Sequence, residues 1–151
     1  MGPQAPLIFC SKYCESSHKV IILHLRGDAL VKLIDIQAAL KAEVVLGEQW
    51  LQKEATGACG ADLMSDVLAF TKERAVLLTG LTNVQVIRTA EISDLVAIVF
   101  VRGKRPGKDV IQMAAEKEIP LMVSEYALYE ACGLLYQQGL PGCSRQVARC
   151  E

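Results

Sequence analysis

The chain has 151 residues, of which 52% are hydrophobic and 22% charged, with a formal net charge of −1. This composition indicates one packed globular domain and excludes a disordered or fibrous chain. The near-neutral charge argues against a dedicated nucleic-acid binder, and the longest apolar run, residues 95–101, is far shorter than the roughly 20 residues that span a bilayer.

The first half of the chain predicts helices alternating with short strands. We expect a helix over 33–42, a strand over 43–46, a connector over 48–61, and a helix from Asp62, its N-cap, to Lys72. A strand over 75–79 follows. Thr82 and Gln85 then have capping-box spacing, which predicts the start of a helix that runs to about Ile92.

The second half continues this alternation. Residues 95–101 are apolar on both faces, as expected of a central parallel strand covered by helices on both sides. We expect a helix over 107–118, a strand over 121–123, and a last helix from Ser124, its N-cap, to Gln138. Alternating strands and helices predict an α/β fold with a largely parallel sheet.

The loop between the strand at 95–101 and the next helix is basic. It is not a P-loop, because only three residues separate Gly103 from Gly107, and Asp109 stands where that motif needs Ser or Thr. ATP hydrolysis by a Walker motif is therefore not expected. The position before a helix still favours an anion, and a solvated basic loop is the alternative. The candidate ligand-binding residues here are Arg102, Lys104 and Arg105.

A second candidate segment, 56–66, combines glycines with carboxylates. Asp62 and Asp66 are four residues apart, on one face of the expected helix, where they would repel a bare phosphate. They suit a ribose hydroxyl, a Mg²⁺-bridged phosphate or an arginine of a partner chain. In the structural alternative Asp62 caps its helix and the glycines only turn the chain. The candidate residues are Thr56, Gly57, Gly60, Asp62, Ser65 and Asp66.

Six cysteines predict free thiols or metal ligands more readily than disulfides, since no convincing signal peptide precedes Lys12 and we expect a cytoplasmic protein. Cys10 and Cys14, followed by two histidines, have the residue types of a metal site but not its spacing, so we expect neither zinc nor an iron–sulfur cluster. Cys59 and Cys132 are expected to be small buried side chains.

The two histidines, His18 and His24, both precede the predicted α/β region. A Ser-His-Asp or Cys-His site therefore cannot be assembled within residues 32–140. We expect no hydrolase or acyl-transfer chemistry.

Several segments in order resemble the DRTGG domain family. They are Thr56 through Asp62-Leu63-Met64-Ser65-Asp66-Val67-Leu68-Ala69, then Leu77-Leu78-Thr79, Asn83-Val84, Leu95-Val96-Ala97-Ile98-Val99 and Glu118-Ile119-Pro120-Leu121. The match runs from about Lys32 to Leu140. In the signature itself, Thr56-Gly57 remain and Ala58 replaces the second glycine, while Gln52-Lys53 stand where Asp-Arg is expected.

The resemblance implies a three-layer α/β/α domain, similar to the N-terminal domain of HPr kinase, that forms homodimers and regulates or senses ligands. Kinase activity in that family belongs to a separate P-loop domain, so no enzyme activity is implied. Similar stand-alone domains resemble accessory proteins encoded near iron-only hydrogenases, which makes an interaction protein of a larger redox complex the alternative. Residues 1–31 would form an extension, 32–140 the domain and 141–151 a tail.

Parallel sheets bind ligands at the carboxyl edge of their strands. In the expected topology the loops at 79–83, 102–108 and 124–125 meet there, which adds Thr79 and Asn83 to the candidate ligand-binding residues. We therefore expect a non-catalytic domain that binds a small anion such as a nucleotide, with or without Mg²⁺, or a protein partner. No resident cofactor is expected.

Overall fold

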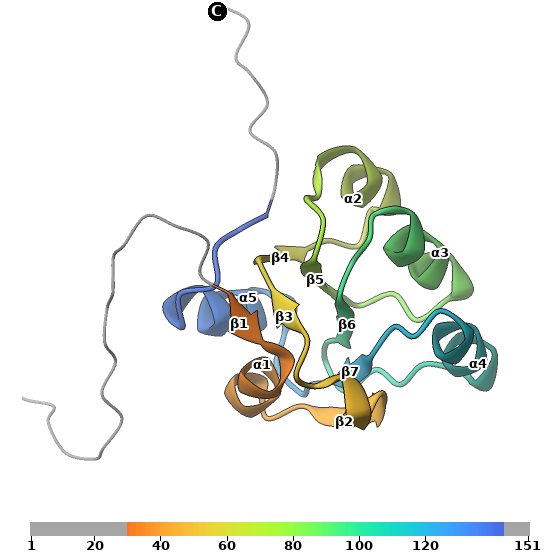
Figure 1. Ribbon diagram of the computed structural model, residues 1–151, viewed down its shortest axis with the longest axis horizontal. Coiled ribbons are helices and arrows are strands. Elements are labelled where there is room, and N and C mark those ends of the chain that lie inside the picture. The colour runs from red at the N-terminus through yellow and green to blue at the C-terminus, as the bar shows by residue number, and fades with distance from the viewer. Residues whose placement is uncertain (1–29, 144–151) are drawn as a thin grey trace, which may run out of the picture.

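Five strands form one sheet in the part of the chain that the structure describes, residues 30–143 of this computed structural model (Figure 1). Their order across the sheet is β2-β7-β6-β5-β4. The strands β4, β5, β6 and β7 run parallel, whereas β2 pairs antiparallel with β7. The bounds are β2 (Glu43–Leu46), β4 (Gly57–Gly60), β5 (Ala75–Thr79), β6 (Ala97–Phe100) and β7 (Leu121–Val123).

Helices cover both faces of this sheet. In Figure 1, α1 and α5 lie on one side of the strands, and α2, α3 and α4 lie on the other. The bounds are α1 (Leu33–Leu40), α2 (Met64–Phe70), α3 (Val84–Ile92), α4 (Lys108–Glu116) and α5 (Leu128–Gln137). The predicted three-layer α/β/α class with a largely parallel sheet is confirmed.

The central strands are buried on both faces, which explains their unbroken apolar sequences. Every residue of β5 and β6 has an exposed fraction of 0%. Alternate side chains enter separate cores: Leu77 and Ile98 pack toward α2, α3 and α4, whereas Val76 and Val99 pack toward α1 and α5. The sequence therefore predicted β5 and β7 with their observed bounds, and β6 with short overhangs.

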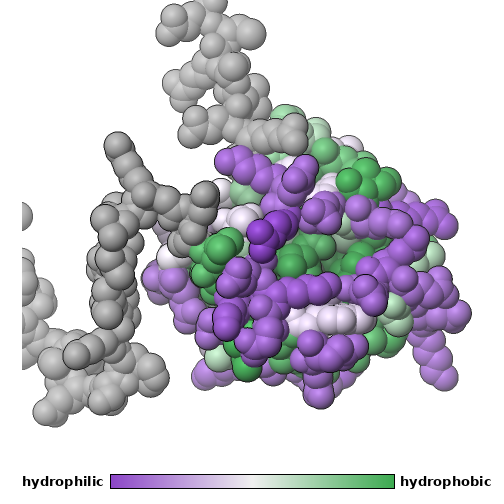
Figure 2. Space-filling model, in the orientation of Figure 1, coloured by the Kyte–Doolittle hydropathy of each residue, from purple (hydrophilic) through white to green (hydrophobic). Residues whose placement is uncertain are grey.

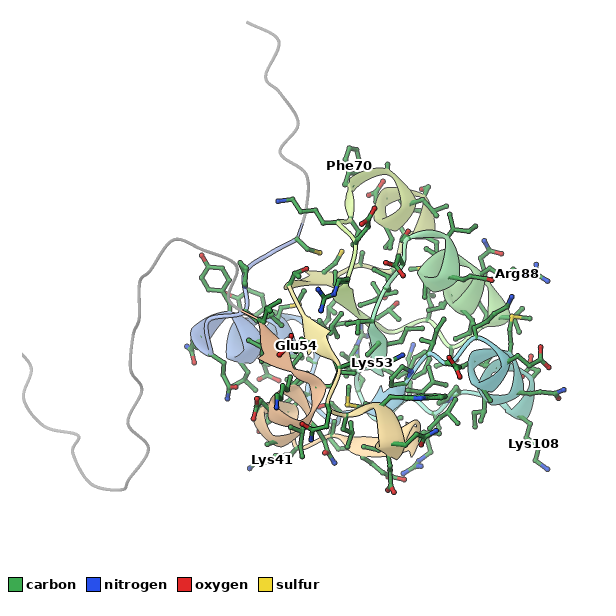
Figure 3. All side chains as sticks on the ribbon, viewed as in Figure 1. Lys41, Lys53, Glu54, Phe70, Arg88 and Lys108 are labelled. Atoms are coloured by element: carbon green, nitrogen blue, oxygen red, sulfur yellow. The ribbon has the colours of Figure 1, made fainter. Side chains whose placement is uncertain are left out.

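The predicted connector 48–61 contains structure that the sequence did not reveal. It holds the 3-10 turn η1 (Glu48–Trp50), a strand β3 (Glu54–Ala55) that pairs with β1 (Val31–Lys32), and the edge strand β4. The sequence of β4 is Gly-Ala-Cys-Gly, without the β-branched or aromatic residues that mark a strand. Lys53 and Glu54, labelled in Figure 3, belong to this connector.

Two predicted helix caps are wrong at the start of α2 and α3. The first helix begins after Leu63 rather than at Asp62, whose carboxylate instead contacts the turn that follows β5. The helix α3 begins after Asn83, and the Asn83 side chain makes no capping hydrogen bond. Thr82 is therefore not the N-cap, and Thr82 and Gln85 form no capping box.

The predicted cap at Ser124 is also wrong, because α5 begins four residues later, with Ala127 as its N-cap. Ser124 is 1% exposed, and its hydroxyl donates to the carbonyl oxygen of Leu40, at 2.8 Å. It thus ties the end of β7 to the end of α1, where a helix leaves carbonyl groups without intrahelical partners.

The three residues after Leu140 lie against the edge of the sheet. Gly142 forms a parallel bridge with Ala58 of β4, and the Lys72 amide donates to the Cys143 carbonyl. Most of the expected extension, residues 1–29, lies outside the described residues together with residues 144–151, whereas Val31 belongs to β1. Cys10, Cys14, His18, His24 and Cys150 are therefore not described.

None of the helices between residues 30 and 143 is long and apolar enough to cross a membrane. The space-filling view in Figure 2 shows hydrophilic residues over much of the visible face, interrupted by smaller hydrophobic areas.

Replacing Ser124 by Ala should lower the free energy of unfolding by about 1–3 kcal/mol, because it leaves the buried Leu40 carbonyl without its hydroxyl donor. Urea unfolding at neutral pH measures this change. The exposed Ser65 provides the control, and Ser65→Ala should change stability by less than about 0.5 kcal/mol. Equal effects of the two substitutions would show that the Ser124–Leu40 hydrogen bond does not stabilise the fold.

Candidate functional site

Three loops are joined at the carboxyl edge of the parallel strands. The Nζ of Lys104, after β6, donates to the carbonyl oxygen of Gly80, after β5, at 3.0 Å. The Arg102 amide donates to the carbonyl oxygen of Tyr126, after β7, at 2.9 Å. The loops that the topology was expected to bring together therefore do meet.

Asp62 connects the end of β4 to this edge. Its Oδ1 accepts hydrogen bonds from the Gly80 amide at 2.7 Å and from the Thr79 hydroxyl at 2.9 Å. The Gly80 amide is the main reason that the pKa of the Asp62 carboxyl lies below its ordinary value, and the Thr79 hydroxyl and the charges of Arg102 and Lys104 add to this effect against the opposing influence of burial. Asp62 is therefore a carboxylate at neutral pH.

A cavity of about 590 Å³ lies beside this cluster. It is widely open to solvent and extends from Gly60, at the end of β4, to the first turn of α5. A side chain at Gly60 would close part of it, since a Cβ there would lie 2.5 Å from the Cys132 Sγ. The lining residues are Gly60, Arg102, Ala127, Leu128, Tyr129 and Cys132.

Arg102 belongs to both the cavity and the charge cluster. Its backbone is in the left-handed region, with φ of 58°. The hydrogen bond from its amide to the carbonyl oxygen of Tyr126 holds the turn in place. The charges of two cations, Arg102 and Lys104, act on the carboxylate of Asp62. A second carboxylate, that of Glu125, lies against Gly103 between the two cations. Tyr129, 90% exposed, adds an aromatic ring at the rim. Arg102 and Tyr129 thus place a guanidinium group and an aromatic ring along the same depression.

Two candidate residues, Thr56 and Gly57, lie at the opposite end of β4 from Gly60. The Thr56 hydroxyl donates to the carbonyl oxygen of Glu73, at 3.1 Å. Gly57 is buried and faces the segment that follows Leu140. The structure therefore separates Thr56 and Gly57 from the cavity and gives them local structural contacts.

Arg105 is turned away from the cluster by an ion pair. Its guanidinium makes two hydrogen bonds to the carboxylate of Glu43 in β2, which lower the pKa of Glu43 and raise that of Arg105. Both side chains are more than half exposed, so the pair contributes little to stability.

The remaining candidates begin the two helices that start at this edge. Ser65 and Asp66 are exposed in the first turn of α2, and Asn83 is exposed at the N-cap of α3. The sequence did not reveal the residues that α5 contributes, Leu128, Tyr129 and Cys132, since no local motif marks them and the helix was expected to start at Ser124.

Within residues 30–143, no group of three or more His, Cys, Asp or Glu side chains is arranged to hold a metal ion.

The sequence profile of the DRTGG domain matches residues 35–137. The chain belongs to the DRTGG domain family. Among solved structures it is similar to the CBS and DRTGG domains of the regulatory region of Clostridium perfringens pyrophosphatase, complexed with the activator diadenosine tetraphosphate, at 19% identity and a TM-score of 0.60. The alignment covers 78% of this chain and 51% of that one, so the match spans about half of its length. No curated protein matches the sequence.

Gly57, which this chain keeps from the DRTGG signature, has a packing role in this structure. A Cβ at Gly57 would lie 2.8 Å from the Cβ of Cys143 and 2.9 Å from the carbonyl oxygen of Pro141. Only a residue without a side chain lets this segment approach β4 closely enough for its hydrogen bonds.

Gly57→Ala should therefore destabilise the domain by about 1–3 kcal/mol, because the added methyl group overpacks against backbone atoms. A matched control is Gly133→Ala, at an exposed position inside α5 where no atom lies within 4 Å of the new methyl group. This control should stabilise the domain by about 0.5–1 kcal/mol. Chemical denaturation of both variants measures the difference, and effects of the same sign would refute the packing role.

The charge of Asp62 should stabilise the fold in a pH-dependent way. Its folded pKa lies below 3.8, so its contribution is present above pH 3.8 and is lost as the pH falls through the folded pKa. Asp62→Asn keeps the shape but removes the charge. Urea unfolding between pH 7 and pH 2 should show a stability gap between wild type and variant that shrinks in acid, whereas a constant gap would contradict the assignment.

Proposed function

We propose that this DRTGG domain is a non-catalytic regulatory module that binds a small anionic ligand, with a nucleotide as the first candidate, at the carboxyl edge of its sheet. The observation that carries the proposal is the position of Arg102, which lines the cavity and lies in the charge cluster with Asp62 and Lys104. A phosphate placed there would meet Arg102 and the start of α5, and Tyr129 offers its ring to a base.

The activator of the similar pyrophosphatase region supports the choice of a nucleotide. That protein's complex contains diadenosine tetraphosphate, a ligand that combines phosphates with planar bases. Asp62 adds a hydrogen-bond acceptor for a ribose hydroxyl or for a water bound to the Mg²⁺ of a Mg²⁺-bridged phosphate. Its Oδ1 is already occupied by two donors, so we assign the ligand contact to Oδ2.

Calorimetric titration with adenine and guanine nucleotides, with and without Mg²⁺, tests this function. Arg102→Ala and Lys104→Ala should each weaken binding by about tenfold or more, since each removes a charged partner of the anion. Lys108→Ala removes the same charge at the exposed start of α4 and should leave the affinity unchanged. The absence of heat with every nucleotide, or an equal loss in the Lys108 variant, would overturn the proposal.

We further propose that the domain self-associates through the end of α2 and the end of α3. Leu68, Phe70 and Ile92 expose 43%, 41% and 72% of their surface, and Leu68 and Ile92 line a common depression of about 150 Å³. Figure 3 shows Phe70 at the outer end of α2. Exposed apolar side chains that are grouped in this way favour a protein interface.

Sedimentation velocity distinguishes a homodimer from the alternative, an interaction surface for another protein of a larger complex. Wild type should sediment as a dimer, and Ile92→Glu should sediment as a monomer because a buried charge opposes the interface. Tyr136→Glu, a change at a 72% exposed position on α5, is the control and should remain dimeric. A wild-type monomer would refute the dimer and leave the surface to a different partner.

A further inference from the structure

Two cysteines lie side by side where residues 141–143 extend the sheet beyond β4. The Ala58 amide donates to the carbonyl oxygen of Pro141 at 2.9 Å, and the Cys143 amide donates to the carbonyl oxygen of Ala58 at 3.1 Å. This parallel bridge sets Gly142 opposite Ala58. The next residues in each strand, Cys59 and Cys143, are therefore also opposite, and their side chains leave the same face of the sheet.

This register is compatible with a disulfide. Neighbouring strands are about 4.8 Å apart, and bridged cysteines usually have Cα atoms about 4.4–6.8 Å apart. Gly57 contributes to the approach, because its missing side chain leaves the space that the Cβ of Cys143 occupies. Both thiols pack toward the core shared by α2, α3 and α4.

The surroundings give the two sulfur atoms different roles. Cys59 is half-buried and accepts a hydrogen bond from the Thr71 hydroxyl at 3.5 Å, whereas Cys143 is 3% exposed. A hydrogen bond with Cys143, assisted by Thr71, lowers the pKa of Cys59 to about 6 against the effect of burial. The same hydrogen bond and burial raise the pKa of Cys143, so the proton stays on Cys143 and the thiolate on Cys59.

We propose that Cys59 and Cys143 form a redox-active dithiol site that reacts with low-molecular-weight disulfides. The Cys59 thiolate attacks one sulfur of the small disulfide, which forms a mixed disulfide and releases one small thiolate. Cys143 then loses its proton and attacks the Cys59 sulfur, which releases the second small thiolate. The net reaction oxidises two protein thiols to one disulfide and reduces one small disulfide to two thiols.

The first step removes the reason for the high pKa of Cys143. Once Cys59 is in a mixed disulfide, it carries no negative charge and no longer needs the Cys143 proton. Cys143 becomes easier to ionise at the moment when it is needed as the second nucleophile. The product would join residues 59 and 143 covalently and fasten the 141–143 segment to the edge of the sheet.

Cys132 is the natural control because it is close but differently placed. It belongs to α5 and packs in the core on the other side of the sheet, where burial and, to a smaller extent, the charge of Cys59 raise its pKa. Neighbouring residues of a strand point to opposite faces, so the contact of Cys132 with Gly60 places Cys132 on the opposite face of the sheet from the Cys59 side chain.

The test uses the full-length chain with Cys10, Cys14 and Cys150 replaced by Ser, which leaves the three cysteines of the described region. This protein is incubated with oxidised glutathione and analysed by peptide mass mapping, which should show a Cys59–Cys143 link. The same link should form to the same extent when Cys132→Ser is added. Cys143→Ala should instead accumulate glutathione on Cys59. A link through Cys132, or a Cys59–glutathione adduct that persists while Cys143 is present, would overturn the proposal.

A second measurement separates the dithiol from two independent thiols. The rate of Cys59 alkylation by iodoacetamide should rise with a midpoint near pH 6, and Cys143→Ala should move that midpoint upward by at least about one pH unit. Circular dichroism verifies that the variant is folded, and Cys143→Ser provides a second variant. The same midpoint in wild type and in both folded variants would show that the two sulfur atoms do not interact.

Discussion

The burial of both faces of the central strands is the constraint on which the rest of this domain depends. Because β5 and β6 have no exposed residue, polar chemistry cannot be placed along them and is confined to strand ends and sheet edges. The carboxyl ends collect Asp62, Arg102 and Lys104, and the β4 edge carries the two cysteines. The candidate sites of the molecule therefore lie where the sheet stops.

The same constraint explains how much the sequence could predict. An apolar run such as that of β6 has few conformational alternatives, and the order of strands and helices then determines which loops meet. The prediction that the loops after β5, β6 and β7 converge needed no knowledge of any side-chain contact. The strand β4 was missed because its two glycines do not have the sequence preference of a strand. Glycine is required there because Cys132 packs against Gly60 and Cys143 packs against Gly57, and both cysteines are distant in the sequence.

The helix caps were wrong for a related reason. Asp62 and Ser124 are residue types that cap helices in isolation. In the folded domain each forms tertiary hydrogen bonds, Asp62 with the turn after β5 and Ser124 with the end of α1. Local preference could not predict these contacts, because the partners become neighbours only after the sheet has assembled. Arg105 shows the same limit, since its partner Glu43 lies 62 residues earlier in the chain.

The outermost position of residues 141–143 also determines how the sheet can meet other chains. Pro141 and Cys143 turn their backbone groups toward Ala58, so among residues 141–143 only Gly142 presents an amide and a carbonyl to an added strand. At the opposite margin, β2 carries an irregularity between Val44 and Leu46, and its Glu43 is engaged by Arg105. Within the described residues, neither margin offers a long, regular ladder to an added strand.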